Sequence, residues 1–171
     1  MKFKSYFNVL AIYVPMTFNL ELSSAKYGER LSQKYTCDGQ DYSPEILWAD
    51  PPSSTKSFIL IMEDPDAPRG TFVHWVLYNI KPGVKQLQEN IPKEKAVDDG
   101  MAQGVNSFNR IGYNGPCPPR KSVHRYFFYL YAVLQEPDLE PGLSKNDLMG
   151  IIKDRTVKQA STMVKYGRSY E

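Results

Sequence analysis

Three long apolar runs, rich in β-branched or aromatic residues, most constrain what this chain can fold into. They are SFILIM at 57–62, FVHWVLYNI at 72–80 and RYFFYLYAVL at 125–134, each bounded by Pro, Gly or Asp. The second and third are apolar on both faces, which predicts central strands with layers packed on each side. Weaker strands are expected at 17–23 and 45–49. So many short strands with turns between them favour a mainly β sandwich over a parallel α/β sheet.

The C-terminal part of the chain has a different pattern. Ser144 is a plausible N-cap with Asp147 three residues later, which predicts a helical start for the segment 145–167. The β-branched Thr156 within it suggests two short helices or a break, and Gly167 is expected as a C-terminal stop.

Between the strand-like runs, residues 81–109 are polar and poorly periodic, with PKEKAVDDG in the middle. We expect a long solvated surface loop there, with a functional lid as the alternative.

Length and charge limit the classes of protein to consider. The chain has 171 residues, which suits one domain with a sizeable core. Its formal net charge is only +2, which gives no field strong enough to predict binding to nucleic acid or to a membrane surface. No stretch reaches the roughly 20 apolar residues of a membrane-spanning helix, so an integral membrane protein is not expected.

The first 25 residues imitate a signal peptide, with MKFK before an apolar run and LSSA after it. Asn8 and Pro15 interrupt the run, while TFNLELSS alternates as a half-buried strand would.

The two cysteines, Cys37 and Cys117, form no metal-ligand cluster and are either reduced thiols or one disulfide. A cytoplasmic protein is the first expectation, and export through residues 1–25 is the alternative.

Four polar side chains could share one site. Asp64 directly follows the run at 57–62, in a loop stiffened by prolines. His74 lies within the second run, and His124 begins the third with Tyr126 on the same face by the period of two. If these side chains converge, both histidines of the chain flank one carboxylate.

Such a site would suit a small anion. A carboxylate beside an imidazole raises the pKa of the imidazole from about 6.5. A cationic ring, a tyrosine hydroxyl and backbone N–H groups could then bind phosphate or carboxylate. A metal site of two histidines and one aspartate is less favoured, because the spacings match no compact ligand motif. A hydrolase would need a nucleophile, either a serine in an elbow such as GxSxG or Cys117, and the sequence has no GxSxG. A nucleotide site would need a GxGxxG motif or a P-loop, and the sequence has neither.

Four motifs in order resemble the signature of the phosphatidylethanolamine-binding protein family, in its bacterial and archaeal branch, which is related to the Raf kinase inhibitor proteins. They are DPDAP at 64–68, HWVLYN at 74–79, GPCPP at 115–119 and HRY at 124–126. The resemblance covers roughly residues 17–165. It leaves residues 1–15 as an N-terminal extension before a single domain at 16–171.

The resemblance implies a two-sheet antiparallel β-sandwich with short C-terminal helices and an anion pocket at one end. It assigns ligand-binding roles to Asp64, His74, Gly115, Pro116, Cys117, Pro119, His124 and Tyr126. It also makes a disulfide between Cys37 and Cys117, beside the pocket, one of the two open alternatives.

The expected function is binding without catalysis and without a cofactor. The ligand would be phosphate, a carboxylate or a phosphoethanolamine-like headgroup, and the protein could regulate a protein partner such as a protease or kinase. The alternatives are a serine protease inhibitor or other interaction module, and a hydrolase that uses the Asp/His pocket.

Overall fold

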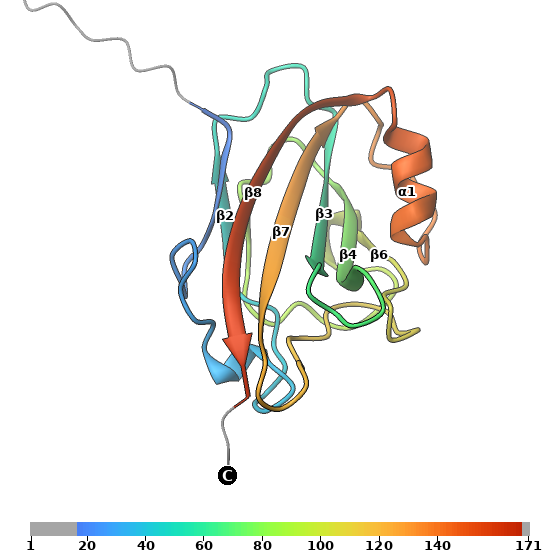
Figure 1. Ribbon diagram of the computed structural model, residues 1–171. Helices are drawn as coiled ribbons and strands as arrows, with labels where there is room; N and C mark the ends of the chain where they lie inside the picture. Colours follow the sequence, from blue (N-terminus) through green and yellow to red (C-terminus); the bar gives the residue numbers. More distant parts are fainter. Residues whose placement is uncertain (1–16, 169–171) are drawn as a thin grey trace, which may run out of the picture.

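The computed structural model describes residues 17–168, and within them the chain forms two antiparallel β-sheets and one α-helix (Figure 1). The larger sheet has the order β6 (Ala102–Gln103), β4 (Phe72–Ile80), β3 (Ser57–Asp64), β7 (Val123–Val133), β8 (Thr156–Gly167). The smaller sheet has the order β1 (Asn19–Leu22), β2 (Ile46–Ala49), β5 (Gln86–Leu87). The other elements are the helix α1 (Lys145–Ile152) and the 3₁₀ turns η1 (Gln33–Tyr35) and η2 (Asp98–Gly100). The predicted two-sheet antiparallel sandwich is confirmed.

The main core lies between the two sheets. Phe58, Leu60 and Met62 point from β3 towards the smaller sheet and are fully buried. The Trp48 ring of β2 meets the Phe58 ring edge-on, with the centroids 5.5 Å apart. Alternate residues of β3 therefore fill the space between the layers, as the period of two requires.

The opposite face of the larger sheet is covered by α1, which Figure 1 shows on the side away from β2. Ile59 and Ile61 of β3 pack there with Leu148 and Ile152 of the helix. Ser144 begins α1 with a capping box, in which its side chain and that of Asp147 each accept a hydrogen bond from the other residue's backbone N–H. β3 is therefore buried on both faces. The central strands predicted for the runs at 72–80 and 125–134 are confirmed, because β4 and β7 each lie between two other strands of the larger sheet.

The expected helical segment 145–167 is wrong in its second half. The helix ends at Ile152, and Thr156–Gly167 forms β8, which pairs with β7 from Val133↔Thr156 to Val123↔Gly167. Pairing along a whole neighbouring strand outweighs the weak local helix preference of these residues. Gly167 is no helix stop: a Cβ there would lie 2.7 Å from Val123 Cγ2, so glycine lets the two strand ends approach.

The segment 81–109 is more ordered than the expected surface loop, because it contains β5, η2 and β6. Gln103 of β6 is fully buried. Its side-chain amide donates to the carbonyls of Pro92 and Glu94, and its Oε1 accepts from the Trp75 indole at 2.8 Å. Buried hydrogen bonds from one glutamine thus hold the segment to β4.

The predicted extension at 1–15 and the signal-like start of the chain lie outside the described residues, apart from residues 17–25, where β1 begins. Among residues 17–168, no helix has the length and apolar character needed to cross a membrane.

Replacement of Leu60 tests the burial of β3. Leu60→Ala is expected to lower the free energy of unfolding by about 2–5 kcal/mol, because it leaves a cavity between packed layers. Val157→Ala, on a side chain that is 40% exposed, is the control and is expected to change it by less than about 0.5 kcal/mol. Urea unfolding of both variants measures the difference. A small loss at Leu60 would contradict the packing described.

Candidate functional site

A pocket opens at the end of the larger sheet where β3 stops and β7 begins. The antiparallel registers set Asp64 opposite Phe72 and Glu63 opposite Phe127, so the ends of three strands meet there. The cavity has a volume of about 250 Å³. It is lined by Asp64, Ala67, Pro68, Phe72, His74, Phe108, Cys117, Pro118, Pro119, His124 and Tyr126.

A hydrogen-bonded pair, Asp64 and His124, forms one side of this pocket. His124 Nδ1 lies 2.7 Å from Asp64 Oδ2, and the two side chains are 8% and 5% exposed. The other carboxylate oxygen of Asp64 accepts the backbone N–H of Asp66 at 2.8 Å. A carboxylate can only accept, so the Nδ1–H of His124 donates to it. Nε2 is therefore the ring nitrogen left for a ligand.

His74 is held in a different way, by a backbone carbonyl. Its Nδ1 lies 2.7 Å from the carbonyl oxygen of Asn114, so Nδ1 carries the proton. The ring is nearly buried, and its centroid lies 5.3 to 5.4 Å from those of Phe72, Phe108 and Tyr126. Burial lowers the pKa of His74 below its ordinary 6.5. His74 is therefore neutral near pH 7 and leaves Nε2 as an acceptor.

Tyr126 supplies a hydroxyl without a partner. Its side chain is fully buried, and among the described residues the hydroxyl makes no hydrogen bond. Burial, and then the negative charge of Asp64, raise the pKa of Tyr126 well above its ordinary value of 10. The group therefore stays protonated and can donate. A buried polar atom without a partner is costly, and a ligand in the pocket would satisfy it.

The GPCPP loop forms a wall, but only part of it faces the cavity. Cys117 and Pro119 line the cavity, whereas Gly115 and Pro116 do not. The N–H of Gly115 donates to Asp41 Oδ1 at 2.6 Å, and the carbonyl of Pro116 accepts from the N–H of Cys37 at 3.1 Å. These two hydrogen bonds hold the part of the loop that does not line the cavity. The ligand-binding role of Gly115 and Pro116 stays a prediction.

Close packing explains the glycine in this wall. A Cβ on Gly115 would lie 2.2 Å from the backbone carbonyl oxygen of Tyr35, so only glycine lets the loop approach so closely.

Cys37 and Cys117 form a disulfide, with their Cα atoms 5.4 Å apart. Of the two alternatives that the sequence left open, the structure has the disulfide.

The sequence missed the aromatic side of the pocket. Phe72 lies on the same face of the strand as His74 by the period of two, but it is not among the residues predicted to line the pocket. Phe108 lies in the segment taken as a solvated loop, and its ring meets that of Phe72 edge-on at 4.7 Å. A lone aromatic residue in the polar stretch NSFNR was the available signal.

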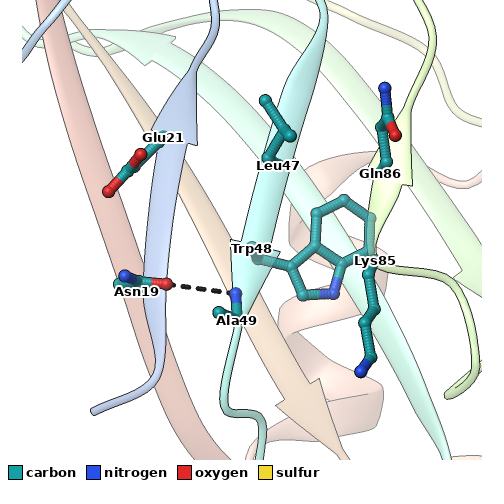
Figure 2. A pocket seen from close by; sticks show the side chains of 7 residues that line it. All are labelled: Asn19, Glu21, Leu47, Trp48, Ala49, Lys85 and Gln86. Carbon is teal, nitrogen blue, oxygen red and sulfur yellow. Dashed lines mark hydrogen bonds between the residues drawn. The ribbon is translucent and has the colours of Figure 1, made fainter. Parts of the chain in front are cut away.

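A second hollow, of about 320 Å³, lies on the smaller sheet (Figure 2). Its lining residues are Asn19, Glu21, Leu47, Trp48, Ala49, Lys85 and Gln86. Figure 2 draws one hydrogen bond among them, from the N–H of Ala49 to Asn19 Oδ1. Glu21 and Lys85, its charged members, are exposed, so the hollow lacks the buried ionisable groups of the first pocket. Within residues 17–168, no three His, Cys, Asp or Glu side chains gather as a metal site.

Fold and pocket together define a class of β-sandwich proteins with a polar cavity at one end of the larger sheet. The sequence model of the family described as phosphatidylethanolamine-binding protein matches residues 22–167. The chain therefore belongs to the phosphatidylethanolamine-binding protein family, as the four motifs predicted.

Individual relatives agree with this membership. A UPF0098 protein of Aquifex aeolicus is 48% identical over 147 residues, which are 85% of each chain. A UPF0098 protein of Methanothermobacter thermautotrophicus is 42% identical over 150 residues, 88% of this chain and 99% of the relative.

Two crystal structures share the fold. A putative phosphatidylethanolamine-binding protein homologue from Chlamydia trachomatis has a TM-score of 0.81 and 34% identity, covering 89% of this chain and 98% of its own. YbcL of E. coli, described as a member of the mammalian family, has a TM-score of 0.82 and 27% identity, covering 89% and 99%.

The buried position of His74 predicts a loss of stability in mild acid. Its pKa is lowered in the folded state, so below about pH 6.5 the unfolded chain binds the proton first. The contribution of neutral His74 is complete above that pH and is lost as the pH falls towards the folded pKa. Proton NMR titration, with the two histidines assigned from a His124→Gln variant, should show His74 titrating below 6.5. Titration of His74 at or above 6.5 would contradict its neutral, buried state.

Proposed function

We propose that the pocket binds a small oxyanion, phosphate or a phosphorylated headgroup, without catalysis. The observation that carries the proposal is the buried Tyr126 hydroxyl, which has no partner among the described residues and lies in a cavity with both histidines. Each histidine has its Nδ1 engaged, by Asp64 or by the carbonyl of Asn114. The side chains of His74, His124 and Tyr126 therefore line the same small volume.

These polar atoms suit hydrogen phosphate and its monoesters. The Tyr126 hydroxyl is a donor, and an imidazolium at His124 would add an Nε2–H donor with a positive charge. Neutral His74 offers an acceptor at Nε2, which matches the P–OH group that hydrogen phosphate keeps and that sulfate lacks. A cavity of about 250 Å³ is smaller than a typical drug-sized pocket, so it suits a headgroup rather than a large metabolite.

The apolar walls support a ligand with a short organic part. Phe72 and Phe108 stand on one side, and Pro68 and Pro118 also line the cavity. Such walls exclude water and strengthen hydrogen bonds to an anion inside. An alkyl or ethanolamine group attached to the phosphate would contact them.

A binding role is favoured over hydrolysis by the residues of the pocket. The lining residues include no serine or threonine, and the sulfur of Cys117 is bonded to Cys37. The Asp64–His124 pair resembles the base of a catalytic triad, but it has no nucleophile beside it in this form of the protein. Inhibition of a serine protease stays a prediction, and a regulatory partner would be an additional property of the binding protein.

The disulfide bears on where the protein works. Disulfides persist in oxidising compartments and are rare in the cytoplasm outside hyperthermophiles. The bond between Cys37 and Cys117 therefore favours the exported alternative over the cytoplasmic location expected from the sequence.

Removal of one hydroxyl tests the proposal. Tyr126→Phe is expected to weaken binding of inorganic phosphate by about tenfold or more, because a hydrogen bond to a charged acceptor contributes about 1.5–3 kcal/mol. The same change should lower the free energy of unfolding by less than about 1 kcal/mol, since within the described residues the hydroxyl interacts with Asp64 but makes no hydrogen bond of ordinary geometry. Isothermal titration calorimetry and urea unfolding measure the two effects.

Tyr129→Phe is the matched control, on the same strand but on its opposite face. Phosphate should bind this variant as it binds the parent. Equal affinity of the Tyr126 variant and the parent would refute the proposed pocket.

The ring of His124 gives a second test, with inorganic phosphate as the ligand. His124→Ala should weaken phosphate binding by about tenfold or more, because it removes one of the polar side chains that line the cavity beside Tyr126. Val123→Ala, on a neighbouring side chain that is 65% exposed, is the control and should bind phosphate as the parent does. Equal affinity of the His124 variant and the parent would contradict a role of this ring in binding.

A further inference from the structure

The pocket wall consists of two stretches that are fixed in different ways. Residues 113–116 are held by the body of the protein: the Tyr113 hydroxyl donates to the carbonyl of Tyr35 at 2.6 Å, and the N–H of Asn114 donates to the carbonyl of His74 at 3.1 Å. The contacts of Gly115 and Pro116 described above complete this anchoring. This stretch does not depend on the disulfide.

The next stretch, residues 117–121, carries the wall itself. Cys117, Pro118 and Pro119 all line the cavity. Prolines cannot donate hydrogen bonds, and the carbonyl of Pro119 accepts from the N–H and the hydroxyl of Ser122, within the same turn. The covalent bond from Cys117 to Cys37 ties this stretch to the loop after η1.

The disulfide is also accessible, because both Cys37 and Cys117 are exposed. Arg120 follows the wall directly, and its charge interacts with that of Asp38, the residue after Cys37. Exposed disulfides are among those that small thiols reduce most readily.

We propose that this disulfide is a thiol-exchange site that controls the pocket. A small thiolate attacks one sulfur of the pair, a mixed disulfide forms, and the other cysteine leaves as a thiolate. A second small thiolate then attacks the mixed disulfide, so that two small thiols are oxidised to one disulfide and Cys37 and Cys117 are reduced. Reduction releases residues 117–121 and thereby removes one wall of the cavity.

The ligand and the reductant have opposite effects on the disulfide. The identity of the ligand rests on the proposed function. A ligand in contact with Pro118 and Pro119 binds the oxidised form better. By linkage, the same ligand makes the disulfide harder to reduce. Oxidation would then complete the wall of the pocket, and reduction by small thiols would remove that wall.

Trypsin provides a test that needs no ligand, because Arg120 and Lys121 are exposed cleavage sites within the released stretch. Cleavage at these residues should become about tenfold faster or more after reduction, since proteolysis follows the opening of local structure. Cleavage at Lys95, exposed in a loop of its own, should keep its rate and so reports any global unfolding. The Cys37→Ser/Cys117→Ser variant should behave as the reduced protein without any reductant.

Calorimetry with inorganic phosphate forms the second arm. Reduced protein and the double serine variant should bind phosphate about tenfold more weakly than oxidised protein, if the loop contributes contacts of ordinary strength. Equal cleavage at Arg120 and Lys121 in the oxidised and reduced states overturns the proposal, and so does equal phosphate affinity in the two states. Faster cleavage on reduction with no phosphate binding in either state would refute the proposed function and leave the release of the wall established.

Discussion

β3 is hydrogen-bonded to β4 along one edge and to β7 along the other, and the rest of the molecule depends on these two registers. Because β3 is apolar on both faces, slipping by one residue would still bury apolar groups, but it would exchange the face beneath α1 with the face between the sheets. The same registers bring Asp64, His74 and His124 to one end of the sheet. Packing and pocket therefore share one geometric cause, and a change in strand register would alter both.

The sequence predicted the central strands well because their apolar runs are continuous and end at Pro, Gly or Asp. It failed for β8, whose residues Thr156 to Gln159 are exposed, so that no alternation of buried and polar residues is visible. That strand exists because β7 offers it a partner along its whole length, which is tertiary information. The capping box at Ser144 was local and was predicted correctly.

The pocket could be predicted in part for similar reasons. Asp64, His124 and Tyr126 follow from strand ends and from the period of two, which are local rules. Which side of the GPCPP loop faces the cavity depends on where Tyr35 and Asp41 lie, so the roles of Gly115 and Pro116 could not be read from the chain. The pairing of cysteines 80 residues apart likewise depends on how two loops meet in space.

Asp64 and Asp66 are separated by one proline, yet they hold opposite sides of β7. Asp64 binds His124 inside the pocket, while Asp66 accepts from the backbone N–H of Arg125 at 2.9 Å and pairs with its guanidinium at 2.6 Å on the surface. The two carboxylates thus contact opposite faces of β7, and the single residue between them, Pro65, sets their spacing. An insertion or deletion between the two aspartates would therefore break the contact with His124 or the contact with Arg125. The length of this loop matters to the site as much as the identity of its residues.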